Sequence, residues 1–135
     1  MINLEMAVRN KLNLVLLVDD DAVSNFITEK FLRNSGLIES LEVMINGKQA
    51  SDFFHDCPSY PDLILLDINM PLMNGFEFLE FLERKGLSGK SKVAILTSSV
   101  RKEDRENALR FNDVIGYIEK PISKEKIIHL LNEIT

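Results

Sequence analysis

The chain has 135 residues, of which 45% are hydrophobic and 27% are charged, and its formal net charge is −5. This length fits one domain, and no apolar run approaches the roughly 20 residues that cross a bilayer. The acidic balance gives no broad attraction for nucleic acid, and the single cysteine, Cys57, excludes an internal disulfide. We therefore expect one cytoplasmic domain that binds neither a membrane nor nucleic acid directly.

Short apolar runs alternate with longer amphipathic segments along the chain. The apolar runs predict strands, and the segments between them have the period of helices that bury one face. The predicted strands cover Leu14–Val18, Leu41–Ile45, Leu63–Leu66, Lys92–Leu96 and Val114–Ile118, and the predicted helices cover Ala22–Asn34, Gly47–Asp56, Gly75–Arg84, Arg101–Phe111 and Lys124–Glu133. We expect residues 1–12 to be a short N-terminal extension and residues 13–135 to be one domain without an attached output domain.

Strands that are apolar on both faces indicate a parallel sheet covered by helices on each side. Right-handed crossovers leave few topologies for five such strands, and the commonest has the strand order 2-1-3-4-5. We predict a flavodoxin-like, doubly wound α/β fold with five parallel strands and five helices. Local signals agree, because Gly36 can end the first helix, Ser123 can cap the last, and Gly75 can open the third.

Polar side chains follow four of the predicted strands. They are Asp19, Asp20 and Asp21 after the first strand, Asp67 after the third, Thr97 after the fourth and Lys120 after the fifth. Because the ends of parallel strands converge on one edge of a sheet, these groups should share a pocket. Crowded carboxylates need a cation, and Mg²⁺ prefers carboxylate and phosphate oxygens. Helix capping explains one or two of the three consecutive acids but not all three.

Asp67 is the candidate nucleophile of this pocket. The loop that follows it, residues 69–75, is tight and leads into a helix, so we expect the carboxylate to be exposed. A carboxylate beside a metal ion can attack a phosphoryl donor, because the ion screens the repulsion between two anions. Thr97 and Lys120 are weak signals singly, but together they supply a hydroxyl and an ammonium for phosphoryl oxygens.

The motifs VDDD, LLDINMPLMNG, LTSS and GYIEKPI occur in that order and resemble the receiver domain of two-component response regulators. The resemblance extends from about Asn13 to the end of the chain. It implies that Asp67 accepts a phosphoryl group from a histidine kinase or a histidine phosphotransfer protein in a cytoplasmic, bacterial pathway. It also implies that the domain catalyses only its own phosphorylation and dephosphorylation, and is otherwise not an enzyme.

The resemblance assigns the metal ligands and the phosphoryl contacts. Mg²⁺ would be held by Asp19, Asp20, Asp67 and the backbone carbonyl of Asn69. Thr97 and Lys120 would contact the phosphoryl group, and a cis bond between Lys120 and Pro121 would aim the ammonium inward.

The resemblance also assigns residues around the phosphoryl site. Tyr117 would change rotamer when Thr97 moves, and Asn69 and Ser99 would tune the lifetime of the phosphoryl group. Asp21 departs from the usual pair of acids and is expected to cap a helix. The segment between Thr97 and Lys120 is slightly long for the family, which leaves open the geometry of the loop before the fifth strand.

Two other functional classes remain open. A flavodoxin-like module that binds a small molecule would need free backbone amides in the first loop, where Asp19–Asp21 would repel a phosphate without a metal. A phosphatase with an aspartyl-phosphate intermediate would be expected to have its nucleophile on the first strand and a cap domain. Within the favoured class, the chain is either a direct effector that switches a partner-binding surface or a phosphorelay intermediate. His55 and His129 lack metal-ligand spacing, and we expect no phosphohistidine.

Overall fold

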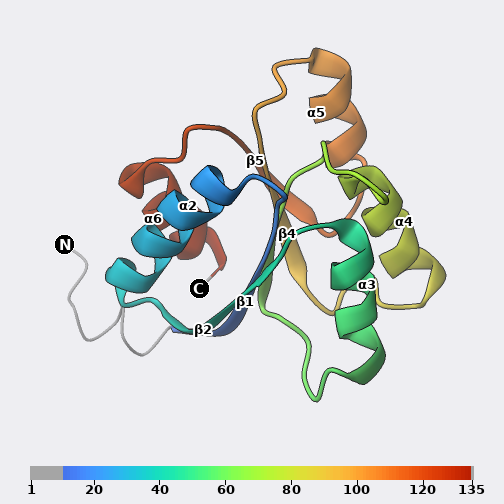
Figure 1. Cartoon of the computed structure of the whole chain (residues 1–135), viewed down its shortest axis with the longest axis horizontal. Helices are drawn as coiled ribbons and strands as arrows, with labels where there is room; N and C mark the ends of the chain where they lie inside the picture. Colours follow the sequence, from blue (N-terminus) through green and yellow to red (C-terminus); the bar gives the residue numbers. More distant parts are fainter. Residues whose placement is uncertain (1–10, 135) are drawn as a thin grey trace.

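The computed structural model describes residues 11–134, which form a parallel sheet with helices on both faces (Figure 1). The elements are, in chain order, β1 (Leu12–Val18), α2 (Ala22–Ser35), β2 (Ile38–Met44), α3 (Gly47–Asp56), β3 (Leu63–Leu66), α4 (Gly75–Arg84), β4 (Lys92–Thr97), α5 (Lys102–Leu109), β5 (Val114–Glu119) and α6 (Lys124–Ile134). The strands lie in the order β2-β1-β3-β4-β5, and every neighbouring pair is parallel. The predicted flavodoxin-like fold is confirmed.

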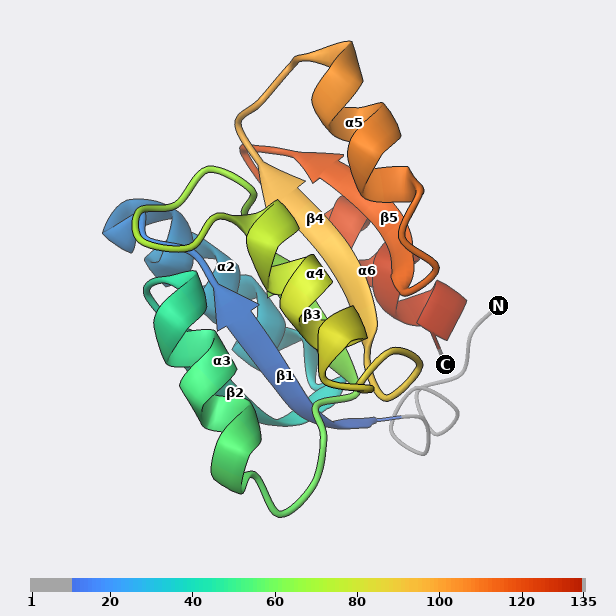
Figure 2. The same cartoon turned by 90° about the vertical axis from the view of Figure 1, so that its right-hand side faces the viewer.

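The helices divide into two groups that cover opposite faces of the sheet. Figure 1 shows α3, α4 and α5 on one side and α2 and α6 on the other. The central strand β3 is buried on both faces, with all four residues of Leu63–Leu66 at 0% exposure. Figure 2 shows the strand arrowheads pointing toward one edge of the sheet. Because both faces are covered by helices, this edge is where strand-end residues can meet a ligand.

Three elements have the bounds that the sequence predicts: α3, β3 and α4. The largest difference is in β2, which begins at Ile38 and not at Leu41. This strand lies at the edge of the sheet, and Glu39, Ser40 and Glu42 are exposed. Acidic and hydroxyl side chains therefore interrupt the apolar pattern from which the start of the strand is predicted.

The other large difference is in α5, which ends at Leu109 and not at Phe111. Phe111 already belongs to the turn before β5, where its carbonyl accepts a hydrogen bond from the amide of Val114 at 3.1 Å. The Phe111 side chain is half-buried and packs against the core from this turn. An apolar residue at the end of a helical pattern thus belongs to the following loop.

The predicted helix caps are confirmed. Asp21 Oδ1 accepts hydrogen bonds from the amides of Val23 and Ser24 at 3.0 and 3.2 Å, which caps α2. Gly36 ends this helix in the left-handed conformation with φ of 71°, which glycine adopts without steric strain. At the start of α6, Ser123 Oγ accepts from the amide of Lys126 at 3.2 Å.

The predicted extension over residues 1–12 lies almost entirely outside the described residues. Its last residue, Leu12, is already part of β1. Within residues 11–134, no helix combines the length and the hydropathy that a membrane-crossing segment needs. Cys57 is half-buried and lies just after α3.

Candidate functional site

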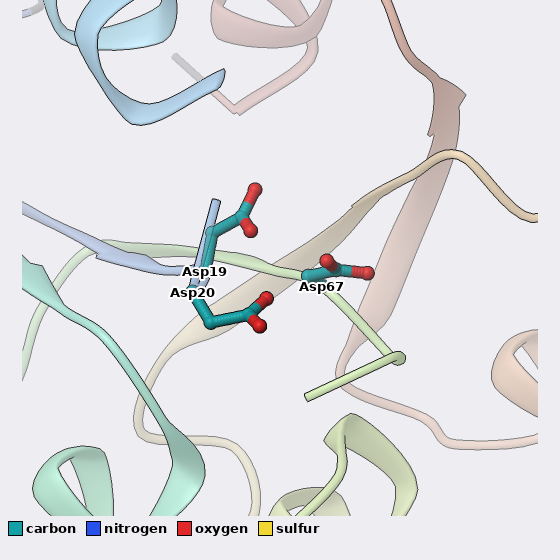
Figure 3. Close-up of side chains that lie close together, drawn as sticks. All are labelled: Asp19, Asp20 and Asp67. Atoms are coloured by element: carbon teal, nitrogen blue, oxygen red, sulfur yellow. The ribbon is translucent and has the colours of Figure 1, made fainter. Parts of the chain in front are cut away.

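Three aspartates meet where β1 and β3 end at the edge of the sheet (Figure 3). The pairing of Val18 with Leu66 places the next residues of the two strands side by side, and the amide of Asp67 donates to the carbonyl of Val18 at 2.9 Å. Asp19, Asp20 and Asp67 each offer a carboxylate oxygen, and these oxygens lie within 4.8 Å of one another. The sequence predicts this grouping, and the structure brings the three residues together.

Lys120 and Thr97 complete the polar cluster from the neighbouring strands. Lys120 Nζ lies 2.6 Å from Asp19 Oδ2 and 3.5 Å from Asp67 Oδ2. Thr97 is fully buried at the end of β4, and its carbonyl accepts a hydrogen bond from the amide of Lys120 at 2.8 Å. The bond between Lys120 and Pro121 is cis, as predicted. Lys120 thus pairs with two of the three grouped carboxylates, and the cluster keeps an excess of negative charge.

Asp67 is buried, with 5% exposure, whereas its loop predicts an exposed carboxylate. The expectation was wrong because the loop folds back over the strand end, where the amide of Asn69 donates to Asp67 Oδ1 at 3.1 Å. A glycine is required where α4 begins, since a Cβ on Gly75 would lie 2.7 Å from both the Asp67 carbonyl oxygen and the Cα of Ile68. The start of α4 therefore presses against the backbone of the candidate nucleophile.

The electrostatics of the cluster favour an added cation. Burial raises the pKa of Asp67, and the nearby Asp19 raises it further, although the Asn69 amide, Lys120 and Thr97 act in the opposite direction. For Lys120, burial lowers the pKa, but the carboxylates of Asp19 and Asp67 outweigh burial and the net pKa is above its ordinary value. Excess carboxylate charge at a largely buried position is the condition that a divalent cation relieves.

The donor set fits a hard divalent cation such as Mg²⁺. All the grouped donors are carboxylate oxygens, and Asp20 is exposed, so one ligand is accessible from solvent. The backbone carbonyl of Asn69 is the fourth predicted ligand. Asn69 lies beside the cluster, because its backbone amide donates a hydrogen bond to Asp67 Oδ1. The three carboxylates among the predicted metal ligands therefore lie close enough together to share one ion.

Asn25 is a site residue that the sequence analysis missed. It lies on α2 with 8% exposure, and its Nδ2 donates to the carbonyl oxygen of Asp19 at 2.7 Å. The buried residues of α2 are Asn25, Thr28 and Leu32, a helical spacing that marks the inward face. A polar amide at an inward position is the signal that could have identified it. This hydrogen bond fixes the backbone that carries Asp19 and Asp20.

Ser99 connects the cluster to the following helix and strand. Its amide donates to Thr97 Oγ1 at 3.2 Å, and its hydroxyl donates to Asp104 Oδ2 at 2.6 Å. Its carbonyl accepts a hydrogen bond from the hydroxyl of Tyr117 at 3.4 Å. The guanidinium of Arg105 lies 5.8 Å from the centre of the Tyr117 ring. The sequence does not single out Asp104 and Arg105 as site residues, because charged residues are common on a polar helix.

Tyr117 is half-buried and packs against the hydrophobic core on the face of the sheet that α3, α4 and α5 cover. Burial raises the pKa of its hydroxyl, so the phenol stays protonated and able to donate. The two histidines take no part in the cluster: His129 Nε2 lies 2.9 Å from Glu133 Oε1 on α6, and His55 lies beside the Phe81 ring.

Comparisons with known proteins cover the region that contains the whole cluster. The family model described as "Response regulator receiver domain" matches residues 15–132. A curated relative from Arabidopsis thaliana, "Two-component response regulator 24", is 32% identical over 88% of this chain and 81% of its own length. The Escherichia coli "Nitrate/nitrite response regulator protein NarL" is also 32% identical over 88% of this chain, which spans only 53% of that protein.

The fold is also found among solved structures. A two component response regulator from Cytophaga hutchinsonii superposes with a TM-score of 0.81 at 28% sequence identity. The matched region covers 92% of this chain and 97% of the Cytophaga chain. The likeness therefore extends over nearly all of both molecules.

Proposed function

This chain belongs to the response regulator receiver domain family, and from that premise we propose that Asp67 accepts a phosphoryl group from a histidine kinase or a histidine phosphotransfer protein. The observation that carries the proposal is the cluster of Asp19, Asp20 and Asp67 within 4.8 Å, with Lys120 Nζ beside it. Carboxylates at this spacing can share a divalent cation, and the ammonium can bind a phosphoryl oxygen.

Each residue of the cluster has a part in the proposed transfer. An oxygen of Asp67 forms a bond to phosphorus as the bond between phosphorus and the donor histidine nitrogen breaks. Asp19, Asp20 and the Asn69 carbonyl would hold Mg²⁺, which when bound screens the charge of the incoming group and orients it. Lys120 and the Thr97 hydroxyl would then bind phosphoryl oxygens. The pairing of Lys120 with both Asp19 and Asp67 supports this, because the ammonium already lies at the acceptor.

The proposed output is a change of surface on α5, β5 and α6. A phosphoryl group adds a charge of roughly −1.5 to −2, which attracts the Thr97 hydroxyl and Lys120. Thr97 is bonded to Ser99, and Ser99 to Tyr117, so a shift of Thr97 reaches the aromatic side chain through two hydrogen bonds. Coupling between two sites of a protein is typically about 1 to 3 kcal/mol, which biases an equilibrium without a change of fold.

Three further properties form part of the proposal. The domain catalyses its own phosphorylation and dephosphorylation and turns over no external substrate. Mg²⁺ is its divalent cofactor, which the oxygen-only donor set supports. A cytoplasmic location is supported by a composition with one cysteine, Cys57, and therefore no internal disulfide.

The proposal is tested with acetyl phosphate, which replaces the protein donor. Incubation with Mg²⁺ should add the mass of one phosphoryl group to the intact chain, and removal of Mg²⁺ with a chelator should abolish the addition. Asp67→Asn should gain no mass, whereas Asp52→Asn, on the exposed side of α3, should be labelled like the parent. Equal labelling of Asp67→Asn and the parent would contradict the assignment.

A further inference from the structure

We propose that Asp104 is a positioning residue for the switch: through Ser99 it holds the loop between β4 and α5 in the arrangement that goes with an unphosphorylated Asp67. The inference rests on the proposed function of Asp67 and names a regulator of that site. It is carried by the hydrogen bond from Ser99 Oγ to Asp104 Oδ2, whose length of 2.6 Å is that of a charge-assisted hydroxyl–carboxylate bond.

The first step is a continuous path from the acceptor to α5. Thr97 ends β4, the strand beside the one that Asp67 follows, and its side chain lowers the pKa of Asp67. Thr97 Oγ1 accepts from the Ser99 amide at 3.2 Å, and the Ser99 hydroxyl donates to Asp104 in the first turn of α5. Ser99 Oγ also accepts from the amide of Arg101 at 3.3 Å, just before the helix begins. Asp104 therefore acts on Thr97 through one intervening residue.

The second step is that little else fixes the beginning of α5. All residues of this helix are described, and of these Ala108 alone is buried. The side chain of its N-cap residue, Arg101, makes no capping hydrogen bond within the described part of the chain. Helix positions with few buried contacts move at low free-energy cost. The hydrogen bonds of Ser99 therefore have a large share in placing the first turn of α5.

The third step gives the direction of the effect. A phosphoryl group on Asp67 draws the Thr97 hydroxyl toward itself, which competes with the hydrogen bond from the Ser99 amide. Ser99 can follow only if its hydroxyl leaves Asp104 or if the first turn of α5 moves with it. The bond between Ser99 and Asp104 thus opposes the switched arrangement. Breaking this bond should increase the affinity of the site for a phosphoryl mimic.

Glu103 provides a matched control on the same turn of the helix. It is acidic like Asp104 and lies in the first turn of α5, so both side chains interact with the helix dipole. Glu103 is exposed and lies 3.7 Å from the exposed Arg101, whereas Asp104 is half-buried and bonded to Ser99. A substitution of Glu103 therefore removes the same charge without touching the path to Thr97.

The experiment measures the affinity for beryllofluoride with Mg²⁺ by titration of amide resonances in the parent and in variants. We expect Asp104→Ala to bind at least about fivefold more tightly, the lower end of coupling between sites. Asp104→Asn keeps an oxygen that accepts from Ser99 and should bind like the parent, as should Glu103→Ala. Ser99→Ala should resemble Asp104→Ala, and the double variant should show no further gain.

Thermal unfolding of the same variants separates positioning from general destabilisation. A residue with only a structural role would lower the unfolding midpoint without tightening the binding of beryllofluoride. Equal affinities of Asp104→Ala and Glu103→Ala, with a parent that binds, would overturn the inference and leave the proposed function intact. A parent that fails to bind beryllofluoride in the presence of Mg²⁺ would instead overturn the proposed function, and the inference with it. If Asp104→Ala does not fold, Ser99→Ala provides the same comparison.

Discussion

Helices α4 and α5 cover the same face of the sheet, yet α4 buries five of its residues and α5, which is described throughout, buries one. α4 begins beside Asp67, where Gly75 meets the backbone of Ile68, and α5 follows Thr97 and Ser99. The proposed phosphoryl acceptor, Asp67, therefore lies against a firmly packed helix, whereas the residues that would sense the phosphoryl group lead into a loosely packed one.

The N-terminus of α4 is also more firmly fixed than the N-terminus of α5. α4 starts with a capping box, in which Asn74 Oδ1 accepts from the Glu77 amide at 2.9 Å and Glu77 Oε1 accepts from the Asn74 amide at 3.1 Å. The first turn of α5 depends on the side chain of Ser99, which lies outside the helix. A fixed acceptor and a movable sensor are what a switch requires, since the chemistry needs constant geometry and the output needs displacement.

Truncation of the core should show the largest difference between the two helices. Phe78 of α4 has 0% exposure, and we expect Phe78→Ala to lower the free energy of unfolding by about 3 to 5 kcal/mol. On α5, Ala108→Gly should lower it by about 1 kcal/mol, mainly through helix propensity. Urea unfolding of both variants measures the difference. Similar losses would show that α5 is packed as firmly as α4.

A methyl group at Gly75 should disturb the acceptor side of the site. The close approach to the Asp67 carbonyl and to Ile68 predicts that Gly75→Ala lowers the free energy of unfolding by about 1 to 3 kcal/mol. The matched control is Gly116→Ala on β5, where a Cβ would lie 3.5 Å from Leu130 Cδ1, an ordinary contact. Urea unfolding should show a clearly smaller loss for this control. A harmless Gly75→Ala would mean that α4 does not press on the acceptor.

Removal of the Asn25 side-chain amide should loosen the backbone at Asp19 and Asp20 without changing their carboxylates. Its bond to the Asp19 carbonyl predicts that Asn25→Leu binds Mg²⁺ about tenfold more weakly, as is common for groups that orient metal ligands. Asn34→Leu, an exposed position on the same helix, serves as the control. Calorimetric titration with Mg²⁺ measures both affinities. If the two variants bind alike, Asn25 does not position the ligands.

The smallest predicted effects concern the helix caps. Asn74→Ala removes one half of the capping box of α4 and should lower the free energy of unfolding by about 1 kcal/mol. Arg101→Ala at the N-cap of α5 should change it by less than about 0.5 kcal/mol, because the side chain is exposed and makes no capping bond. Thermal unfolding distinguishes the two. A larger loss for Arg101→Ala would reverse the comparison between the helix ends.

The sequence predicts the fold and the acidic cluster for a physical reason. Buried parallel strands are continuous apolar runs, and the residues after them must meet at one edge of the sheet. The sequence alone therefore predicts that Asp19 and Asp67 lie close together. β2 was misplaced by three residues at its start, Ile38 against Leu41, because an edge strand mixes exposed polar residues with apolar ones.

The positioning residues could not be found in the same way. Asn25 and Asp104 act through single hydrogen bonds that depend on where a helix lies against the strand ends. Such placement leaves no periodic pattern, and polar residues on helices are usually solvated. The burial of Asp67 likewise depends on how its loop folds back, which no local spacing specifies.

Hydrogen exchange of the parent chain, with and without beryllofluoride and Mg²⁺, tests the central claim most directly. We predict that amides of the β4–α5 loop and the first turn of α5, residues 98–105, exchange faster when beryllofluoride is bound, because either the hydrogen bond between Ser99 and Asp104 breaks or the first turn of α5 is displaced with Ser99. Amides of α4, residues 75–84, should keep their rates, and Asp67→Asn should show no change in either segment. Equal changes in α4 and α5, or an unchanged α5, would contradict the account of a fixed acceptor and a movable sensor.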